Sequence, residues 1–219
     1  MSWSGGKDSA LALYEARSMG LKVSHLLAMI SPQGYSKSNN ASLDILNLQA
    51  EAIGAELVTG MAGWEDYEDE YRKALHSVAP GVEGCIFGDI DIEGHRDWCR
   101  RIAAEANLKC MHPIWGKRQE DLIARFIGLG FKAVISVVNT KYLGVEWLGR
   151  PIDQGTVEEM VSLGVSPCGE LGEYHTIVTG GPIFQRPVPV EEAGRSLLSG
   201  YGFLTLRPRQ SKLDPPGPQ

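Results

Sequence analysis

The stretch Ser4-Gly5-Gly6-Lys7-Asp8-Ser9 decides the fold, because it stands where a first strand would pass into a helix. Its two glycines let the backbone approach an anion closely, and Lys7 supplies a positive charge. The first N–H groups of the following helix would point at the same spot. Ser4 and Ser9 can donate hydroxyl hydrogen bonds, and Asp8 can hold a cation beside phosphate oxygens. The stretch therefore predicts a phosphate-binding loop.

Two commoner nucleotide-binding motifs do not fit this stretch. A Walker A loop needs a further glycine upstream of its Gly-Lys pair, and the residues ahead of Ser4 do not supply it. A GxGxxG dinucleotide fingerprint is also absent. The plain structural alternative is a glycine–serine turn that begins a helix and leaves Lys7 in solvent.

Outward from this loop, the first half alternates strands with amphipathic helices. We expect helices over residues 8–19, 40–53 (capped by Ser42 or Asn40), 65–78 and 92–107, and strands over 21–30, 56–60, 83–90 and 108–112. This alternation predicts a parallel sheet with helices on both faces, whose ligands bind at the carboxyl ends of the strands. Only Met1 to Trp3 precede the loop, so we expect the native start to lie upstream.

The second half changes pattern after about Trp115. We expect helices over residues 118–129 and 155–164, a glycine-rich loop over 166–176, and strands over 131–138, 177–190 and 201–206. The predicted organisation is a domain of residues 1–116, a smaller α/β domain of residues 117–207 and a disordered tail of residues 208–219, which is poor in apolar side chains.

Composition excludes several classes of protein. The chain has 219 residues, 43% hydrophobic and 22% charged, which is typical of a soluble globular protein. No apolar run is long enough to span a membrane. The formal charge is −6 and no block of basic residues occurs, which disfavours nucleic acid as a partner. The four cysteines are scattered, as in proteins of a reducing cytoplasm.

A second unusual stretch is Pro167-Cys168-Gly169-Glu170-Leu171-Gly172-Glu173-Tyr174-His175-Thr176. Its two carboxylates around glycines suit an ammonium, a metal or a polar substrate, and His175 could carry a proton. The alternative is a polar hairpin loop with Glu170 and Glu173 in solvent. Cys168 beside this stretch is a weaker candidate for a nucleophile.

The first stretch closely resembles the SGGxDS signature of the PP-loop ATP pyrophosphatases, which cleave ATP between its α and β phosphates. Together the two stretches resemble the diphthine–ammonia ligase (diphthamide synthase) family, whose C-terminal domain bears a GExGE(Y/F)xT stretch. The resemblance covers roughly residues 3–190. It implies a Rossmann-like parallel-sheet domain of the HUP (adenine nucleotide alpha hydrolase-like) class, followed by a smaller C-terminal α/β domain.

The resemblance also implies an ATP-dependent amide ligase with ATP and Mg²⁺ as cofactors. A carboxylate, diphthine on a protein side chain or a related acceptor, would be adenylated and then amidated by ammonia, and a homodimer is one assembly to consider. The implied catalytic residues are Lys7, Asp8, Glu170, Glu173 and His175, with Asp8 as metal ligand. The implied nucleotide-binding residues are Ser4, Gly5, Gly6, Lys7, Asp8, Ser9, Met29 and Gly88. The implied acceptor-binding residues are Asp89, Gly169, Glu170, Gly172, Glu173, Tyr174 and Thr176.

One departure from the family pattern concerns the stretch from Gly88 to Arg96, which has added acids and indicates a bacterial-type relative with another acceptor. Its Asp89, Asp91, Glu93 and His95 could form a metal or substrate site, or the stretch could simply be a capped helix start, at Asp91 or from Ile92 onward, with its acids in solvent. Two alternative functions stay open: another PP-loop chemistry, such as tRNA thiolation or amidation, and a nucleotide-binding sensor without turnover.

Overall fold

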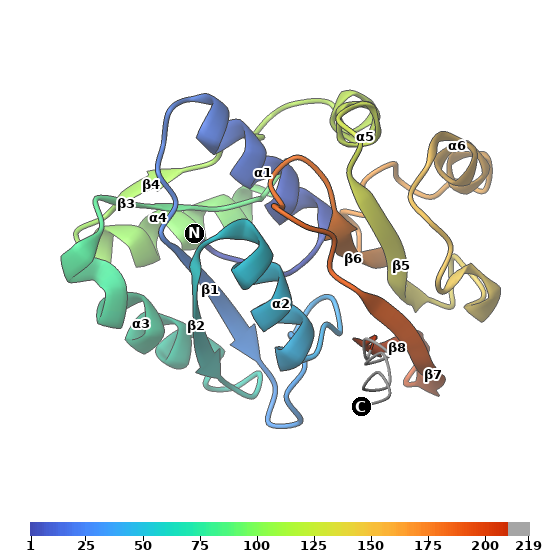
Figure 1. Ribbon diagram of the computed structural model, residues 1–219, viewed down its shortest axis with the longest axis horizontal. Coiled ribbons are helices and arrows are strands. Elements are labelled where there is room, and N and C mark those ends of the chain that lie inside the picture. Colours follow the sequence, from blue (N-terminus) through green and yellow to red (C-terminus); the bar gives the residue numbers. More distant parts are fainter. Residues whose placement is uncertain (210–219) are drawn as a thin grey trace, which may run out of the picture.

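The computed structural model describes residues 1–209 and contains parallel strand pairs and a separate antiparallel sheet, in a mixed α/β fold (Figure 1). The helices are α1 Lys7–Ser18, α2 Leu43–Ile53, α3 Tyr67–Val78, α4 Glu93–Glu105, α5 Gln119–Gly128 and α6 Gln154–Ser162. The strands are β1 His25–Ile30, β2 Glu56–Met61, β3 Gly84–Ile86, β4 Lys109–Met111, β5 Lys132–Asn139, β6 Tyr174–Gly180, β7 Val190–Leu198 and β8 Tyr201–Pro208.

The N-terminal residues join two parallel strand pairs. β1 pairs with β2, and β3 pairs with β4. Between them, the Trp3 N–H donates to the Leu27 carbonyl at 2.8 Å, and the Ser2 N–H donates to the Ile86 carbonyl at 2.9 Å. The strand order is therefore β2-β1-(residues 1–3)-β3-β4, and the central segment leads directly into the glycine loop.

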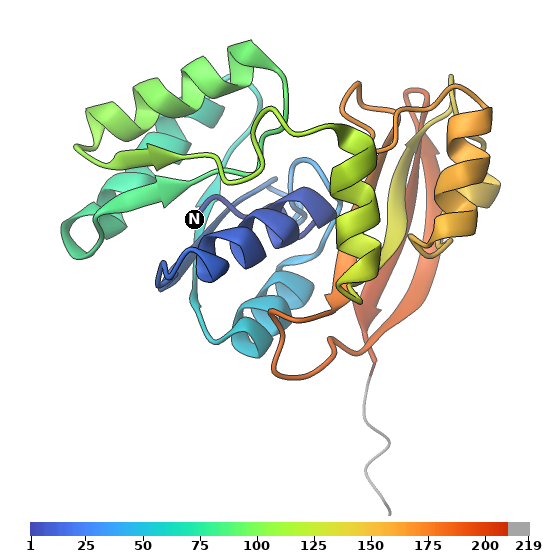
Figure 2. The ribbon, with the colours of Figure 1, turned by 90° about the horizontal axis from the view of Figure 1, so that it is seen from above.

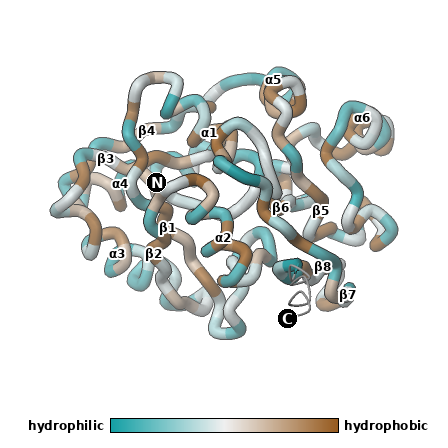
Figure 3. Tube along the Cα trace, in the orientation of Figure 1, coloured by the Kyte–Doolittle hydropathy of each residue, from teal (hydrophilic) through white to brown (hydrophobic). Residues whose placement is uncertain are grey.

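Helices cover both faces of this parallel arrangement, as the sequence alternation predicts. Side chains of a strand alternate between its two faces. Accordingly, Leu26 and Ala28 of β1 share a buried cluster with α1 and α2, whereas Leu27 and Met29 share another with α3 and α4. Figure 3 shows hydrophobic segments following the inner strands, with hydrophilic colouring more frequent in the outer loops and turns.

The residues at the starts of α2 and α4 show where the chain leaves the preceding loops. Ser42 is the cap of α2, since its Oγ accepts from the Ile45 N–H at 3.4 Å, whereas Asn40 donates from its side chain to the Leu204 carbonyl. Of the two helix starts considered for the acidic stretch, Asp91 is wrong: Ile92 is the N-cap position of α4, which begins at Glu93 and has no side-chain cap.

The C-terminal sheet is antiparallel, with strand order β6-β5-β8-β7. Figure 2 shows α5 and α6 on opposite sides of it. The predicted strand over residues 177–190 is wrong: β6 already begins at Tyr174 and ends at Gly180, and β7 begins only at Val190. The predicted tail also begins too early, because β8 extends to Pro208; residues 210–219 lie outside the described residues.

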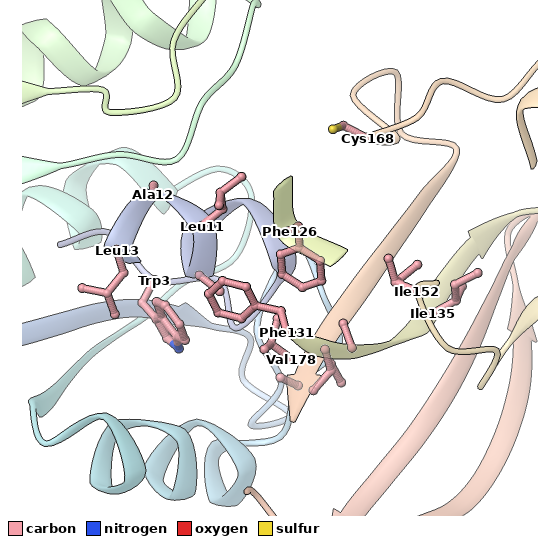
Figure 4. Close-up of a cluster of buried hydrophobic side chains, with 14 of the residues drawn as sticks. Trp3, Leu11, Ala12, Leu13, Phe126, Phe131, Ile135, Ile152, Cys168 and Val178 are labelled. Carbon is pink, nitrogen blue, oxygen red and sulfur yellow. The ribbon is translucent and has the colours of Figure 1, made fainter. Parts of the chain in front are cut away.

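One hydrophobic cluster joins both halves of the chain (Figure 4). It contains Trp3 and Leu11 from the N-terminal half together with Phe126, Phe131 and Val178 from the C-terminal half. The rings of Phe126 and Phe131 stack with centroids 4.7 Å apart. The antiparallel sheet is thereby fixed against α1, beside the glycine loop. Among residues 1–209, no helix has the length and apolarity that a membrane span requires.

Candidate active site

A cavity of about 390 Å³ lies where the central segment and β3 end. Residues of the glycine loop and residues of the second unusual stretch both line this cavity. The lining residues are Ser2, Ser4, Lys7, Asp8, Ser9, Ser38, Asn39, Gly88, Asp89, Ile92, His95, Cys168, Gly169, Glu170, Gly172, Tyr174, His175 and Thr176. Carboxyl ends of parallel strands, next to the point where the strand order reverses, are the usual ligand position in such sheets.

The glycine loop needs both of its glycines. Gly5 has φ +82°, a backbone conformation that residues with a side chain rarely adopt. Gly6 leaves no room for a side chain, because an added Cβ would lie 1.9 Å from Asn39 Nδ2. That Asn39 amide donates to the Thr176 carbonyl at 2.8 Å and to Ser4 Oγ at 3.4 Å. Asn39 therefore holds the loop against β6.

Lys7 is a buried cation between the two stretches, so the alternative that leaves it in solvent is wrong. The residue is 4% exposed, and its Nζ donates to Asp8 Oδ2 at 2.8 Å and to the Cys168 carbonyl. Its backbone N–H donates to Thr176 Oγ1 at 3.1 Å. Burial is the largest single influence and opposes the charge, but the Asp8 carboxylate and the neighbouring Tyr174 and Cys168 side chains together outweigh it, so the pKa of Lys7 is raised. The ammonium is charged at every physiological pH.

Glu173 supports the second loop from inside. It is 2% exposed, and its two carboxylate oxygens accept from the Ser166 N–H at 3.1 Å and the Leu171 N–H at 2.9 Å. The alternative that puts Glu173 in solvent is therefore wrong. Close backbone contact also requires Gly169, whose added Cβ would lie 2.7 Å from the Tyr174 carbonyl oxygen.

Glu170 is the carboxyl group of this loop that lines the cavity. Burial, and then the nearby carboxylates of Asp8 and Asp91, raise the pKa of Glu170 to about 8, although Lys7 opposes the shift. Burial, followed by the charge of Lys7, lowers the pKa of His175 to about 4. Near pH 7 the cavity therefore holds a neutral imidazole and a carboxyl group that still carries its proton in most molecules.

Cys168 does not have the electrostatics of a nucleophile. Its thiol is buried and donates to the Gln119 carbonyl at 3.4 Å. Burial raises the pKa of the Cys168 thiol to about 12, even though Lys7 opposes the shift. The reactive thiolate is thus scarce at neutral pH.

The acidic stretch after β3 forms the opposite wall. Asp91 accepts from Gln119 Nε2 at 2.8 Å, and Gln119 Oε1 accepts from the Cys168 N–H at 3.3 Å. Gln119 thereby connects the acidic stretch to the second loop, although neither Gln119 nor Asp91 lines the cavity itself. Asp89 Oδ1 lies 3.5 Å from His95 Nδ1, with His95 on the first turn of α4.

The cavity brings together most of the site residues expected from sequence, but not all. Gly5, Gly6, Met29 and Glu173 are not among its lining residues. Met29 packs under Gly60, where an added Cβ would lie 2.6 Å from the Met29 sulfur. The lining residues missing from the expected set include Ser2, Ser38, Asn39 and Ile92. For Ser38, Asn39 and Ile92, the one sequence signal is a position after the end of a strand, whereas Ser2 lies within the central segment and has no such signal.

The residues present suit a polyphosphate with its cation. A buried ammonium and the first turn of α1 face the cavity, and the tight glycine turn precedes them in the chain. A lysine ammonium and the N–H groups of a helix start are groups that bind phosphate oxygens. The Asp8 side chain, 29% exposed, is available to a hard cation such as Mg²⁺. Glu170, Asp89 and Tyr174 line the remainder, which suits a polar second substrate.

Comparisons with known proteins agree on one family. A family model described as the diphthamide synthase N-terminal domain matches residues 1–110, and the model of its C-terminal domain matches residues 118–213. A Bos taurus diphthine–ammonia ligase is 30% identical over 136 residues, 59% of this chain and 50% of the relative. The Schizosaccharomyces pombe protein of that name is 26% identical over 210 residues, 84% of this chain and 34% of the relative.

A mouse (Mus musculus) diphthine–ammonia ligase is 24% identical over 229 aligned positions, which cover 91% of this chain and 85% of the relative. The chain thus spans about half of the Bos taurus relative and about a third of the Schizosaccharomyces pombe one. The N-terminal family model ends at residue 110 and the C-terminal one begins at residue 118, so the two meet near the expected change of pattern.

Proposed function

The chain belongs to the diphthamide synthase family, and from that membership we propose that it is an ATP-dependent amide ligase. It adenylates a carboxylate, diphthine or a related acceptor, with release of pyrophosphate, and ammonia then gives the amide and AMP. One observation carries the proposal: Lys7 of the first signature donates from its backbone to Thr176 and from its side chain to Cys168 of the second. The two signatures thus share one cavity.

The strand order supports a Rossmann-like assignment of the N-terminal domain. Counting residues 1–3 as the first strand, the order β2-β1-(1–3)-β3-β4 corresponds to 3-2-1-4-5, the order of doubly wound nucleotide-binding sheets. The HUP class is part of this proposal. So is the division into an ATP-binding domain of residues 1–116 and an acceptor-binding domain of residues 117–207.

In the first step, an acceptor carboxylate oxygen attacks the α-phosphorus, and the bond to the β-phosphate bridging oxygen breaks. Negative charge grows on the departing pyrophosphate. The Lys7 ammonium and the N–H groups at the start of α1 are fixed in advance where they can stabilise that charge. Mg²⁺ held by Asp8 would add positive charge beside the phosphate oxygens.

In the second step, ammonia attacks the activated carbonyl carbon and AMP leaves. The attacking nitrogen loses one proton as the amide forms. Glu170 and His175 both line the cavity. With a pKa of about 8, Glu170 can gain or lose a proton near neutral pH, and with a pKa of about 4, His175 is uncharged there. In the fraction of molecules in which Glu170 is deprotonated, its carboxylate orients ammonium or accepts its proton. The neutral His175 ring accepts or donates a hydrogen bond without adding charge.

We assign Glu173 a positioning role rather than contact with the reacting atoms. Its carboxylate holds two backbone N–H groups of the loop that carries Glu170. Asn39, which ties Ser4 to β6, has the corresponding role for the glycine loop. Glu173 and Asn39 thus affect the reaction indirectly, by fixing the positions of groups that line the cavity.

Product identification tests the proposal. The protein is incubated with Mg-ATP, ammonium and candidate carboxylates, including diphthine on its protein, and nucleotide products are separated by chromatography. AMP and pyrophosphate formed only with acceptor and ammonium support the ligase. ADP and phosphate contradict the phosphate-loop assignment. Nucleotide binding without product contradicts turnover and favours a sensor, and product from tRNA favours the other PP-loop chemistry.

A variant pair connects that activity to the cavity. Lys7→Met keeps the length of the buried stem but removes the charge, and it should lower the rate at least about 100-fold, as loss of a preorganised charge at a phosphoryl centre does. Lys141→Met, at an exposed position, is the matched control and should retain the rate. An active Lys7→Met would remove Lys7 from the proposal.

A further inference from the structure

Three side chains with metal-binding atoms converge behind one wall of the cavity. Asp89 follows β3, Cys99 lies in the middle of α4, and His112 follows β4. A carboxylate oxygen, the thiol sulfur and a ring nitrogen of these residues all lie within 4.8 Å of one another. Because three separate elements supply them, the fold and not a local sequence motif brings these atoms together.

His112 has an unsatisfied atom at this position. Its Nε2 is buried and has no hydrogen-bond partner among the residues that the structure describes. The other ring nitrogen, Nδ1, lies 3.7 Å from Cys110 Sγ, and the ring stacks on Phe87 with centroids 5.5 Å apart. A buried polar atom without a partner costs about 1–3 kcal/mol, so an orphaned imidazole nitrogen in a fixed ring requires a reason.

The polar contacts that Asp89 and Cys99 make with each other and with His95 are long. Cys99 Sγ donates to Asp89 Oδ2 at 3.5 Å, and the exposed His95 ring lies 3.5 Å from Asp89 Oδ1. Cys99 itself is 3% exposed in the cluster between α3, α4 and the sheet. The three side chains are therefore held close together by packing rather than by strong bonds among themselves.

We propose that Asp89, Cys99 and His112 form a binding site for a borderline-soft divalent cation, with Zn²⁺ as the best fit. One sulfur, one nitrogen and one oxygen ligand match the donor set that Zn²⁺ accepts in tetrahedral sites. The Cys99 thiol, which donates to Asp89 in the metal-free chain, loses its proton to solvent as the cation binds. Mg²⁺ prefers oxygen ligands and does not suit a thiolate. The site therefore differs in chemistry from the Mg²⁺ position assigned above to Asp8.

Three protein ligands leave one tetrahedral position, which water or a substrate atom takes in sites of this kind. Asp89 is shared between this site and the cavity lining, so a bound cation lies at the wall where the second substrate is expected. The metal site itself does not rest on the proposed ligase activity, since its ligands and its test are independent of ATP.

Titration with Co²⁺ tests the site by spectroscopy. The full chain, freed of metal by a chelator and kept reduced, is titrated with Co²⁺ and then with Zn²⁺. We expect one Co²⁺ per chain with the near-ultraviolet absorption of a thiolate–Co²⁺ bond, which Zn²⁺ abolishes and excess Mg²⁺ leaves unchanged. Absence of thiolate–Co²⁺ absorption at saturating Co²⁺ would overturn the proposal.

Matched cysteine variants locate the ligand. Cys99→Ser should remove the thiolate–Co²⁺ absorption, and Cys110→Ser, which removes the neighbouring thiol outside the cluster, should keep it. His112→Gln serves as a second variant in case Cys99→Ser does not fold, and it should weaken Co²⁺ binding at least about tenfold. Circular dichroism checks the fold of each. Absorption that survives in Cys99→Ser, or that is lost only in Cys110→Ser, contradicts the assignment.

Discussion

At the scale of single residues, Gly6 is the position where shape matters most. Its backbone lies against the Asn39 amide, and that amide bonds both Ser4 and Thr176. A methyl group at Gly6 would displace Asn39 and release the glycine loop from β6. We expect Gly6→Ala to weaken nucleotide binding by at least about tenfold, equivalent to about 1.4 kcal/mol, measured by calorimetric titration with Mg-ATP.

Gly94→Ala is the matched control for that experiment. Gly94 lies in α4, and an added Cβ would meet nothing within 4 Å. Since alanine is a better helix former than glycine, this variant should bind nucleotide normally and unfold at slightly higher denaturant concentration. Equal binding by the two variants would contradict a close approach at Gly6.

The Glu170 carboxyl group should make stability depend on pH. Burial and the nearby carboxylates raise its pKa in the folded chain to about 8, from an ordinary value of 4.5. A raised folded pKa means that the protonated form favours folding, so this contribution is complete below about pH 4.5 and is lost as pH rises through about 8. Glu170→Gln, which stays neutral, should therefore unfold at higher urea concentration than the natural chain at pH 9 and differ little at pH 5.

Urea titrations across that pH range measure the effect, with the exposed Glu158→Gln as the matched control. The control should show the same difference from the natural chain at both ends of the range. A Glu170→Gln difference that does not grow with pH would show that the carboxyl group is not perturbed in the folded chain.

The sequence could identify those site residues whose amino-acid type and pattern are characteristic of a chemical role. The glycine–lysine stretch and the acids of the second stretch are unusual enough to recognise, and they do lie around one cavity. Asn39 could not be found in this way, because an asparagine in a loop is common and its role depends on contact with Ser4 and Thr176. Glu173 looked like a reacting group for the opposite reason: its type is reactive, but its position is internal.

At the scale of elements, the loop before β6 depends on Glu173. Its carboxylate satisfies the N–H groups of Ser166 and Leu171 in a buried position. Glu173→Ala would leave both without this partner, and we expect it to lower the free energy of unfolding by about 1–3 kcal/mol, measured by urea denaturation. The exposed Glu158→Ala should change it by less than about 0.5 kcal/mol. Unchanged stability in Glu173→Ala would contradict the positioning role.

The helices and strands differ in how well they could be predicted from the sequence. The parallel half could be predicted because its strands are buried and its helices amphipathic, and only the ends shift; for instance, the strand expected over residues 21–30 begins at His25. The strand expected over residues 177–190 failed because β7 is an edge strand with mostly exposed side chains. Its pairing with β8 is visible only when the chain is folded.

At the scale of the whole molecule, the two halves of the chain are bound together next to the cavity. Gln49, fully buried on α2, donates to the carbonyls of Gly5 at 3.1 Å and Val178 at 2.7 Å and accepts from the Trp3 indole at 2.9 Å. The Val178 N–H also donates to the Gly5 carbonyl at 2.9 Å. The glycine loop therefore keeps its shape through contacts with a strand more than 160 residues away.

This connection predicts cooperative unfolding of both halves, and Phe126 offers the test. The residue is 1% exposed, stacks on Phe131 and lies in the hydrophobic cluster that also contains Trp3. Phe126→Ala should lower the free energy of unfolding by about 3–5 kcal/mol. Because the cluster is shared, hydrogen exchange should speed up in β1 as well as in β6, whereas the exposed Leu163→Ala should change neither. Loss of protection confined to β6 would mean that the halves unfold independently, and that the cavity between them can open without unfolding the nucleotide-binding sheet.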